Sequence, residues 1–139
     1  MNIAQIITDR KAGFLRVDSR RVYDSSLEQV ISLFGLIAKP ESLEECDIDY
    51  AIEVVKTILW RDLAYGVKLL PEETAYERAT FLVNQFYDVE SKLYTNGDFK
   101  NYHNESSFSW HDLTNATFSA GIIIVNSSYA TCIMVEDED

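Results

Sequence analysis

Histidine and carboxylate side chains are the groups of this chain whose types and spacing could perform acid–base chemistry or bind a metal. The two histidines, His103 and His111, lie near Asp98, Glu105 and Asp112 in the sequence. Imidazole and carboxylate groups serve as metal ligands and as general acids and bases near neutral pH. The spacing of these histidines matches no compact zinc motif, and no cysteine lies close to them. We therefore expect exposed loop histidines, with a small enzyme or metal-binding domain built on His103, His111 and Asp112 as the alternative.

The two cysteines, Cys46 and Cys132, show no pattern typical of a nucleophile or a redox site. They are far apart in the sequence, outside any CxxC spacing, and the chain has no GxSxG motif. Glu44, Glu45 and Asp47 surround Cys46, and neighbouring carboxylates raise the pKa of a thiol and suppress the reactive thiolate. Phosphate-binding glycine loops are also missing. The sequence therefore predicts buried free thiols, no catalytic residue, no cofactor and no metal.

Carboxylates are the chemistry-bearing side chains that the sequence does concentrate. The chain has 139 residues with 12 Lys and Arg against 23 Asp and Glu, a formal net charge of -11. This balance argues against binding nucleic acid or an anionic membrane through net positive charge. The carboxylates gather in an inner group of Glu41, Glu44, Glu45, Asp47, Asp49 and Glu53 and a terminal group of Glu136, Asp137, Glu138 and Asp139. Each group is either a solvated surface or a contact surface for a strongly basic partner.

Aromatic side chains in the polar stretch of residues 91–115 could anchor such an interface. Tyr and Trp dominate the energetic hot spots of protein interfaces, although the same rings could cover the core instead. The aromatic residues of this stretch are Tyr94, Phe99, Tyr102, Phe108 and Trp110. The candidate partner-binding residues are therefore Glu41, Glu44, Glu45, Asp47, Asp49, Asp98, Trp110, Asp112, Glu136, Asp137, Glu138 and Asp139.

The sequence predicts three helices that would position these residues. The first helix is expected to start at Ser25 or Ser26, and Ser25 and Glu28 fit a capping box. Apolar residues recur at helical spacing over residues 48–63 and predict a central second helix. The third helix opens at Pro71, because proline is tolerated in a first turn and two glutamates follow it.

The C-terminal third of the chain has the composition of β-strands. Residues 118–125 and 129–135 are rich in β-branched and apolar residues, and the polar residues 126–128 connect them, which predicts a β-hairpin. Both strands are apolar on both faces, so other elements must cover each side. A third strand could come from residues 107–110 or from residues 14–17.

The elements together predict a single α+β domain over residues 1–139. It consists of a helical body at about 25–90, a polar loop at about 91–115, a hairpin at about 116–135 and an acidic tail at 136–139. Three or more helices pack on a small antiparallel sheet in this arrangement. The basic residues near the N-terminus are expected to form a solvated face or to contact the acidic remainder: Arg10, Lys11, Arg16, Arg20 and Arg21.

The sequence shows no segment typical of secretion or membrane insertion. Asp9 interrupts the short apolar N-terminal stretch before it could form the core of a signal peptide. Residues 113–135 carry no charge, but polar residues lie in their middle, and these are costly at the centre of a bilayer. We therefore expect a cytoplasmic protein that does not bind membranes.

Several segments resemble those of small immunity proteins encoded beside bacterial polymorphic toxins, including contact-dependent growth inhibition systems. They are LWRDLAYGV at residues 59–67, YTNG at 94–97, and TF at 117–118 with VEDED at 135–139, within a resemblance that covers residues 25–139. The resemblance implies a non-enzymatic protein that binds the C-terminal domain of a cognate toxin and blocks its active site or its access to substrate. Toxins of this kind are frequently nucleases with basic clefts, which an acidic inhibitor suits. An inhibitor that mimics DNA is a further alternative.

Overall fold

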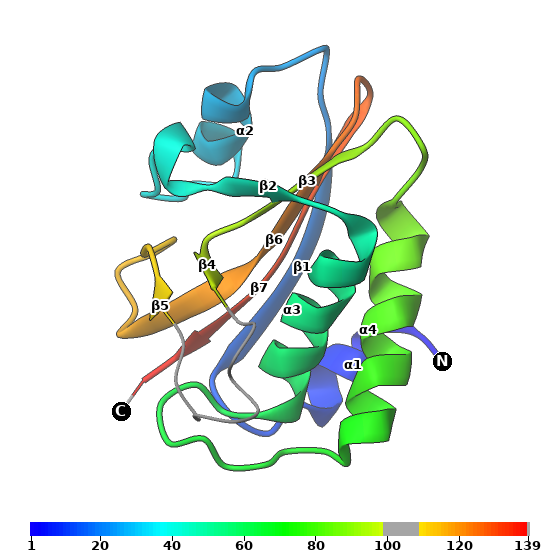
Figure 1. Cartoon of the computed structure of the whole chain (residues 1–139), viewed down its shortest axis with the longest axis vertical. Helices are drawn as coiled ribbons and strands as arrows, with labels where there is room; N and C mark the ends of the chain where they lie inside the picture. The colour runs from blue at the N-terminus through cyan, green and yellow to red at the C-terminus, as the bar shows by residue number, and fades with distance from the viewer. Residues whose placement is uncertain (99–108, 139) are drawn as a thin grey trace.

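The computed structural model describes residues 1–98 and 109–138, which form an α+β domain. Figure 1 shows its elements in chain order: α1 (Ile3–Asp9), β1 (Phe14–Arg21), α2 (Leu27–Leu33), the 3-10 turn η1 (Pro40–Ser42), β2 (Glu44–Cys46), α3 (Ile48–Trp60), α4 (Glu72–Phe86), β3 (Lys92–Thr95), β4 (Gly97–Asp98), β5 (Ser109–Trp110), β6 (Phe118–Val125) and β7 (Tyr129–Asp137). The α+β class is therefore as the sequence predicts.

The main sheet has five strands in the order β1-β7-β6-β3-β2, and every neighbouring pair is antiparallel. The predicted hairpin is its centre, since β6 and β7 pair from Phe118 opposite Asp137 to Val125 opposite Ala130. The first and last strands of the chain also pair with each other, and β1 and β2 form the two outer edges. β4 and β5 form a separate two-stranded sheet.

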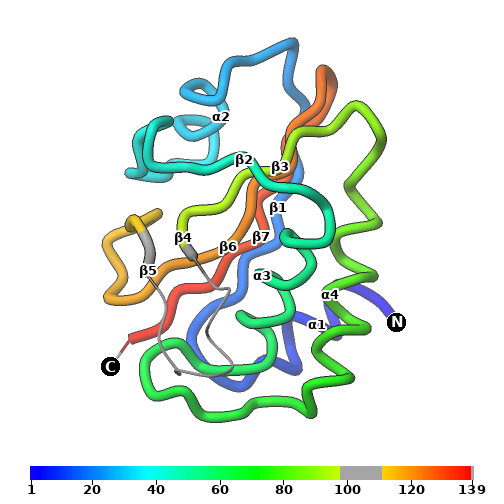
Figure 2. Tube along the Cα trace, viewed as in Figure 1, coloured from blue at the N-terminus to red at the C-terminus, as the bar shows by residue number. Residues whose placement is uncertain are grey.

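Helices and the chain around them cover both faces of the sheet, as the doubly apolar strands require. Figure 2 shows α1, α3 and α4 on one side of the sheet and α2 on the other. On the first side, Ile58 and Leu82 pack with Ile122 and other inward residues of the sheet. On the second side, Phe34 and the chain after α2 cover residues such as Met134. The domain therefore has two apolar clusters with the sheet between them.

The helix predictions are correct in number and order for the three helices after residue 25 but differ at their ends. The capping box of α2 uses Ser26 and Gln29 instead of Ser25 and Glu28. α3 ends at Trp60, three residues before the end of the apolar pattern. Leu63, the last residue of that pattern, is buried but lies in the turn that follows the helix. α1 lies within the N-terminal segment for which the sequence predicts no helix.

The strand predictions need two corrections. β7 runs to Asp137, so the predicted acidic tail begins inside a strand. The predicted polar loop of residues 91–115 contains β3, a member of the main sheet. Of the two candidate third strands, residues 14–17 belong to β1 in the main sheet, whereas Ser109 and Trp110 form β5 in the small one.

Asn96 connects the small sheet to the main one and is buried, at 1% exposure. Its side-chain amide donates to the carbonyls of His111 and Ser119 at 2.7 and 2.8 Å, and its Oδ1 accepts from the Gly121 N–H at 3.1 Å. A buried amide with all these partners satisfied fixes the relative position of three chain segments. The side chain of Asn96 thus ties strands together, and its backbone forms the bend between β3 and β4.

Candidate partner-binding surface

The inner acidic residues lie together on one edge of the main sheet and at the start of the helix that follows it. Glu44 and Glu45 belong to the edge strand β2, Glu41 lies in η1 just before it, and Asp47 and Asp49 begin α3. All five residues are exposed. We call this group, Glu41, Glu44, Glu45, Asp47 and Asp49, the β2 acidic surface.

Local structure explains why these carboxylates face the solvent. Asp47 is the N-cap of α3, and its side chain accepts a hydrogen bond from the Tyr50 N–H at 2.8 Å. Asp49 lies in the first turn, where a negative charge interacts favourably with the positive end of the helix dipole. Glu44 and Glu45 occupy a short edge strand, and charged side chains on such an edge discourage unwanted strand pairing.

The β2 acidic surface carries negative charge that the described cations do not neutralise. Among the described residues, no Lys or Arg forms an ion pair with any of its five carboxylates. The sixth acid of the inner group, Glu53, differs because Lys56 lies 3.6 Å from its Oε2. Other carboxylates in the described part of the chain do pair with arginines, among them Asp9 with Arg78, Asp18 with Arg16 and Arg20, and Asp137 with Arg10.

The pKa of the Cys46 thiol, in the same strand, is raised, as the sequence predicts. Burial, followed by the charges of Asp47, Glu45 and Glu44, raises the pKa of its thiol to about 12. The predicted direction is confirmed, but burial is a larger cause than the carboxylates. A thiol with such a raised pKa is neutral near pH 7 and a poor nucleophile.

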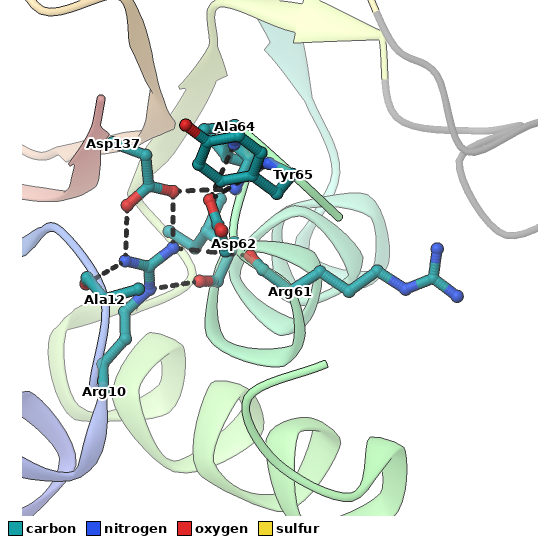
Figure 3. A network of polar contacts seen from close by, with 9 residues as sticks. Arg10, Ala12, Arg61, Asp62, Ala64, Tyr65 and Asp137 are labelled. Carbon is teal, nitrogen blue, oxygen red and sulfur yellow. Dashed lines mark hydrogen bonds and ion pairs between the residues drawn. The ribbon is translucent and has the colours of Figure 1, made fainter. Parts of the chain in front are cut away.

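The terminal acidic group is placed very differently, and Figure 3 shows its central contact. Asp137 is 2% exposed, and its two carboxylate oxygens each accept a hydrogen bond of 2.7 Å from the Arg10 guanidinium. Its Oδ2 also accepts the Leu63 N–H at 2.8 Å. The prediction that Asp137 is part of an exposed partner-binding tail is therefore wrong.

Arg10 satisfies its remaining donors on backbone carbonyls around the same buried point. Its Nε donates to the Ile58 carbonyl at 2.7 Å, and further N–H groups donate to the carbonyls of Ala12 and Arg61. Figure 3 shows how these contacts gather the segment after α1, the end of α3 and the end of β7. Part of the predicted basic face is thus a self-complementary contact with an acid at the other end of the chain.

Two other acids of the terminal group form hydrogen bonds with the segment that precedes β6. Glu136 is half-buried and accepts a hydrogen bond from the Thr114 hydroxyl at 3.1 Å. Glu138 is exposed and accepts from both the backbone N–H and the hydroxyl of Thr117. Asp139 lies outside the described residues. These contacts make the described part of the tail the end of a folded strand.

The histidine region is only partly within the described chain. His103 lies outside it, and so do the side chains of Asp98 and Trp110, whose backbones form β4 and β5. His111 and Asp112 are exposed, and the His111 N–H donates to the Asn96 carbonyl at 2.7 Å. No group of three or more His, Cys, Asp or Glu side chains suited to a metal ion occurs in the portion that the structure describes.

Comparison with known proteins gives no basis for assigning a site, so the assignment rests on the geometry. No family model matches the sequence, and neither the curated proteins nor the solved structures contain a significant match. Within the described residues, no helix has both the length and the apolar character needed to cross a membrane. The site that the geometry supports best is the β2 acidic surface.

Sequence reasoning missed the buried Arg10–Asp137 pair, although one signal of it is present. Residues of one strand face alternate sides of the sheet, and Ile133 and Val135 of β7 both face the cluster beneath α3. Continuing that alternation carries Asp137 to the same buried face. The partner could not be found in this way, since Arg10 lies in an irregular segment at the other end of the sequence.

Proposed function

We propose that this protein is a non-enzymatic immunity protein that binds and neutralises a cognate bacterial toxin domain, a nuclease with a basic cleft, through the β2 acidic surface. The observation that carries the proposal is that β2 and its flanking residues expose five carboxylates, close together in the sequence, that no described cation neutralises. The sequence resemblance to immunity proteins supports it independently.

Electrostatics favours this use of the surface. A basic cleft that binds the phosphates of a nucleic acid is attracted to a dense group of carboxylates, which accelerates encounter and disfavours partners of the wrong charge. The net charge of -11 extends this attraction over the whole molecule. The partner is therefore a basic protein domain, and nucleic acid itself is repelled.

Tyr94 of β3 is the aromatic candidate whose side chain the structure describes. It is half-buried and packs against the apolar cluster beneath α2, and Glu45 lies opposite it in the β2–β3 register. It therefore supports the β2 acidic surface from within the sheet. We assign Tyr94 to the core; the side chains of the other aromatic candidates, Phe99, Tyr102, Phe108 and Trp110, lie outside the described residues.

The test measures association of the full chain with the toxin domain encoded by the neighbouring gene. Co-expression should protect cells from that domain and yield a tight 1:1 complex. In stopped-flow measurements at low salt, Glu44→Lys/Glu45→Lys should lower the association rate constant about tenfold or more, because steering depends on local charge. The wild-type rate should fall steeply as salt is added.

A matched control separates the surface from the net charge. Glu28→Lys/Glu77→Lys reverses two exposed glutamates on α2 and α4 and changes the net charge by the same amount. This control should keep most of the wild-type association rate. Equal losses in the two variants would contradict the assignment to the β2 acidic surface, and failure of the toxin domain to bind or be neutralised would contradict the proposed function.

A further inference from the structure

The opposite edge of the main sheet, β1, is long and has one described neighbour. Its eight residues pair with β7 from Phe14 opposite Glu136 to Arg21 opposite Tyr129. No other strand of the described residues pairs with its outer side. Phe14, at the start of β1, leaves 56% of its area exposed. An edge of this length is a template for a further strand.

The register of β1 tells which of its backbone groups point outward. The Val22 N–H, just beyond β1, donates to the Ser128 carbonyl at 2.8 Å, in step with the β1–β7 register. Since the hydrogen-bonding direction alternates along a strand, the even-numbered residues of β1 bond to β7. The N–H and carbonyl groups of Leu15, Val17 and Ser19 therefore point to the open side.

Charged side chains alternate along one face of this edge. Arg16, Asp18 and Arg20 follow one another at every second residue, and Asp18 Oδ2 lies 3.2 and 3.0 Å from the two guanidinium groups. Partial burial works to raise the pKa of Asp18, but hydrogen bonds from Arg20 and Arg16 outweigh it and hold the pKa below its usual value. Arg16 and Arg20 are also fixed by hydrogen bonds to the carbonyls of Phe34 and Leu33.

This charge row is self-complementary in one antiparallel register. When a second copy of β1 is paired with Val17 opposite its own counterpart, Arg16 faces Asp18 of the other copy, and Phe14 faces Arg20. A shift that places Asp18 opposite itself instead sets Arg16 against Arg20, and like charges directly opposite each other are unfavourable. The favoured register also brings the outward groups of Leu15, Val17 and Ser19 into hydrogen-bonding positions.

We propose that the protein forms a symmetric dimer in which the β1 edges of two copies pair antiparallel about Val17 and join the two sheets into one. The cross-strand charge pairs select this register, and the exposed Phe14 ring covers the Arg20 guanidinium of the second copy. The β2 acidic surface lies at the far edge of each sheet and stays free. The inference does not depend on the proposed function.

The first experiment removes one outward donor from the edge. Ser19→Pro deletes an N–H that points away from β7, and proline is tolerated at such edge positions. Ser19→Ala is the matched control, because it loses the same hydroxyl, which bonds to Thr131, and keeps the N–H. In sedimentation analysis over a range of concentrations, wild type and Ser19→Ala should be dimers, whereas Ser19→Pro should weaken dimerisation at least about tenfold through lost hydrogen bonds and a steric clash.

The second experiment tests the register by disulfide crosslinking. Val17→Cys places a thiol on the two-fold axis at a Cα separation that suits a disulfide, so mild oxidation should yield a covalent dimer. Asp18→Cys should crosslink much less, because its counterpart is displaced along the strand. A monomeric wild type, or dimers that Ser19→Pro leaves intact, would overturn the proposal. Preferential crosslinking at residue 18 or open-ended oligomers would do the same. Neither readout involves a toxin, so failure here and failure of the proposed function are distinguishable.

Discussion

The inner and terminal acidic segments have similar compositions, yet the fold places their side chains in different surroundings. In residues 41–49, all five carboxylates are exposed and form no ion pair with a described cation. In residues 136–138, Glu136 is half-buried, whereas Asp137 is buried and forms an ion pair with Arg10. The carboxylates of the first segment are therefore accessible to a partner, whereas the contacts of the second segment mainly stabilise the fold.

Backbone period and position in the sheet cause this difference. The terminal segment continues a central strand, where alternate residues must face the core, so one of its acids is buried. A buried carboxylate is tolerated only with a well-placed cation and hydrogen-bond donors, and the bidentate Arg10 contact supplies them. The inner segment occupies a three-residue edge strand and a helix start, where its carboxylates remain at the surface. The density of charge alone does not distinguish these roles.

The largest effect is expected when the buried pair is broken. Asp137→Ala leaves the Arg10 guanidinium buried beside an unpartnered Leu63 N–H. Loss of one member of a buried ion pair costs about 3–5 kcal/mol, and we expect a decrease of that size in the free energy of unfolding. Urea denaturation followed by circular dichroism measures it.

Two further variants sharpen this test of the terminal segment. Glu138→Ala, in the exposed part of the same segment, should change the free energy of unfolding by less than about 1 kcal/mol. Arg10→Met combined with Asp137→Ala should cost less than the sum of the two single changes, because the pair acts as a unit. Similar losses for Asp137→Ala and Glu138→Ala would erase the distinction between buried and exposed acids.

Within the inner segment, the effect on stability should come from one residue and should be smaller. Asp47→Ala removes the cap of α3 and should lower the free energy of unfolding by about 1 kcal/mol. Asp47→Ser removes the same charge but keeps a capping oxygen, and its stability should stay close to wild type. Thermal denaturation of the two variants compares them directly. Equal destabilisation would indicate that the charge of Asp47, and not its hydrogen bond to Tyr50, stabilises the helix.

The parts of the fold that the sequence predicts are those with strong local patterns. The helix over α3 has an uninterrupted apolar repeat, and the central hairpin has two long apolar strands around a polar turn, so both are recognisable. β2 was missed because three residues, two of them glutamates, carry no strand pattern. Its strand character comes from pairing with β3, which is a tertiary contact.

The sequence predicts those features of the candidate site that depend on local structure and misses those that depend on distant contacts. The exposure of Glu44 and Glu45 follows from a dense run of acids that lacks the apolar alternation of a buried strand. The burial of Asp137 depends on where β7 ends and on Arg10, which lies 127 positions away in the chain. Contacts of this kind follow from the closure of the sheet by its first and last strands, and no local pattern records them.

The smallest expected effect uses Cys46 as a reporter of the β2 acidic surface. Because burial is the largest cause of its raised pKa, Glu44→Gln/Glu45→Gln should lower that pKa by less than about one unit from its value of about 12. The neutral thiol stabilises the fold fully below its unfolded pKa of about 9, and this contribution is lost as the pH rises towards about 12.

Iodoacetamide reacts with the thiolate, so alkylation of wild-type Cys46 should keep accelerating above pH 9. The rate profile of the variant should shift slightly to lower pH. Cys132, read from its own peptide by mass spectrometry, is the internal control, since burial raises its pKa without any contribution from these glutamates. An unchanged Cys46 profile would mean that Glu44 and Glu45 do not contribute to the raised pKa, and that burial and Asp47 account for it.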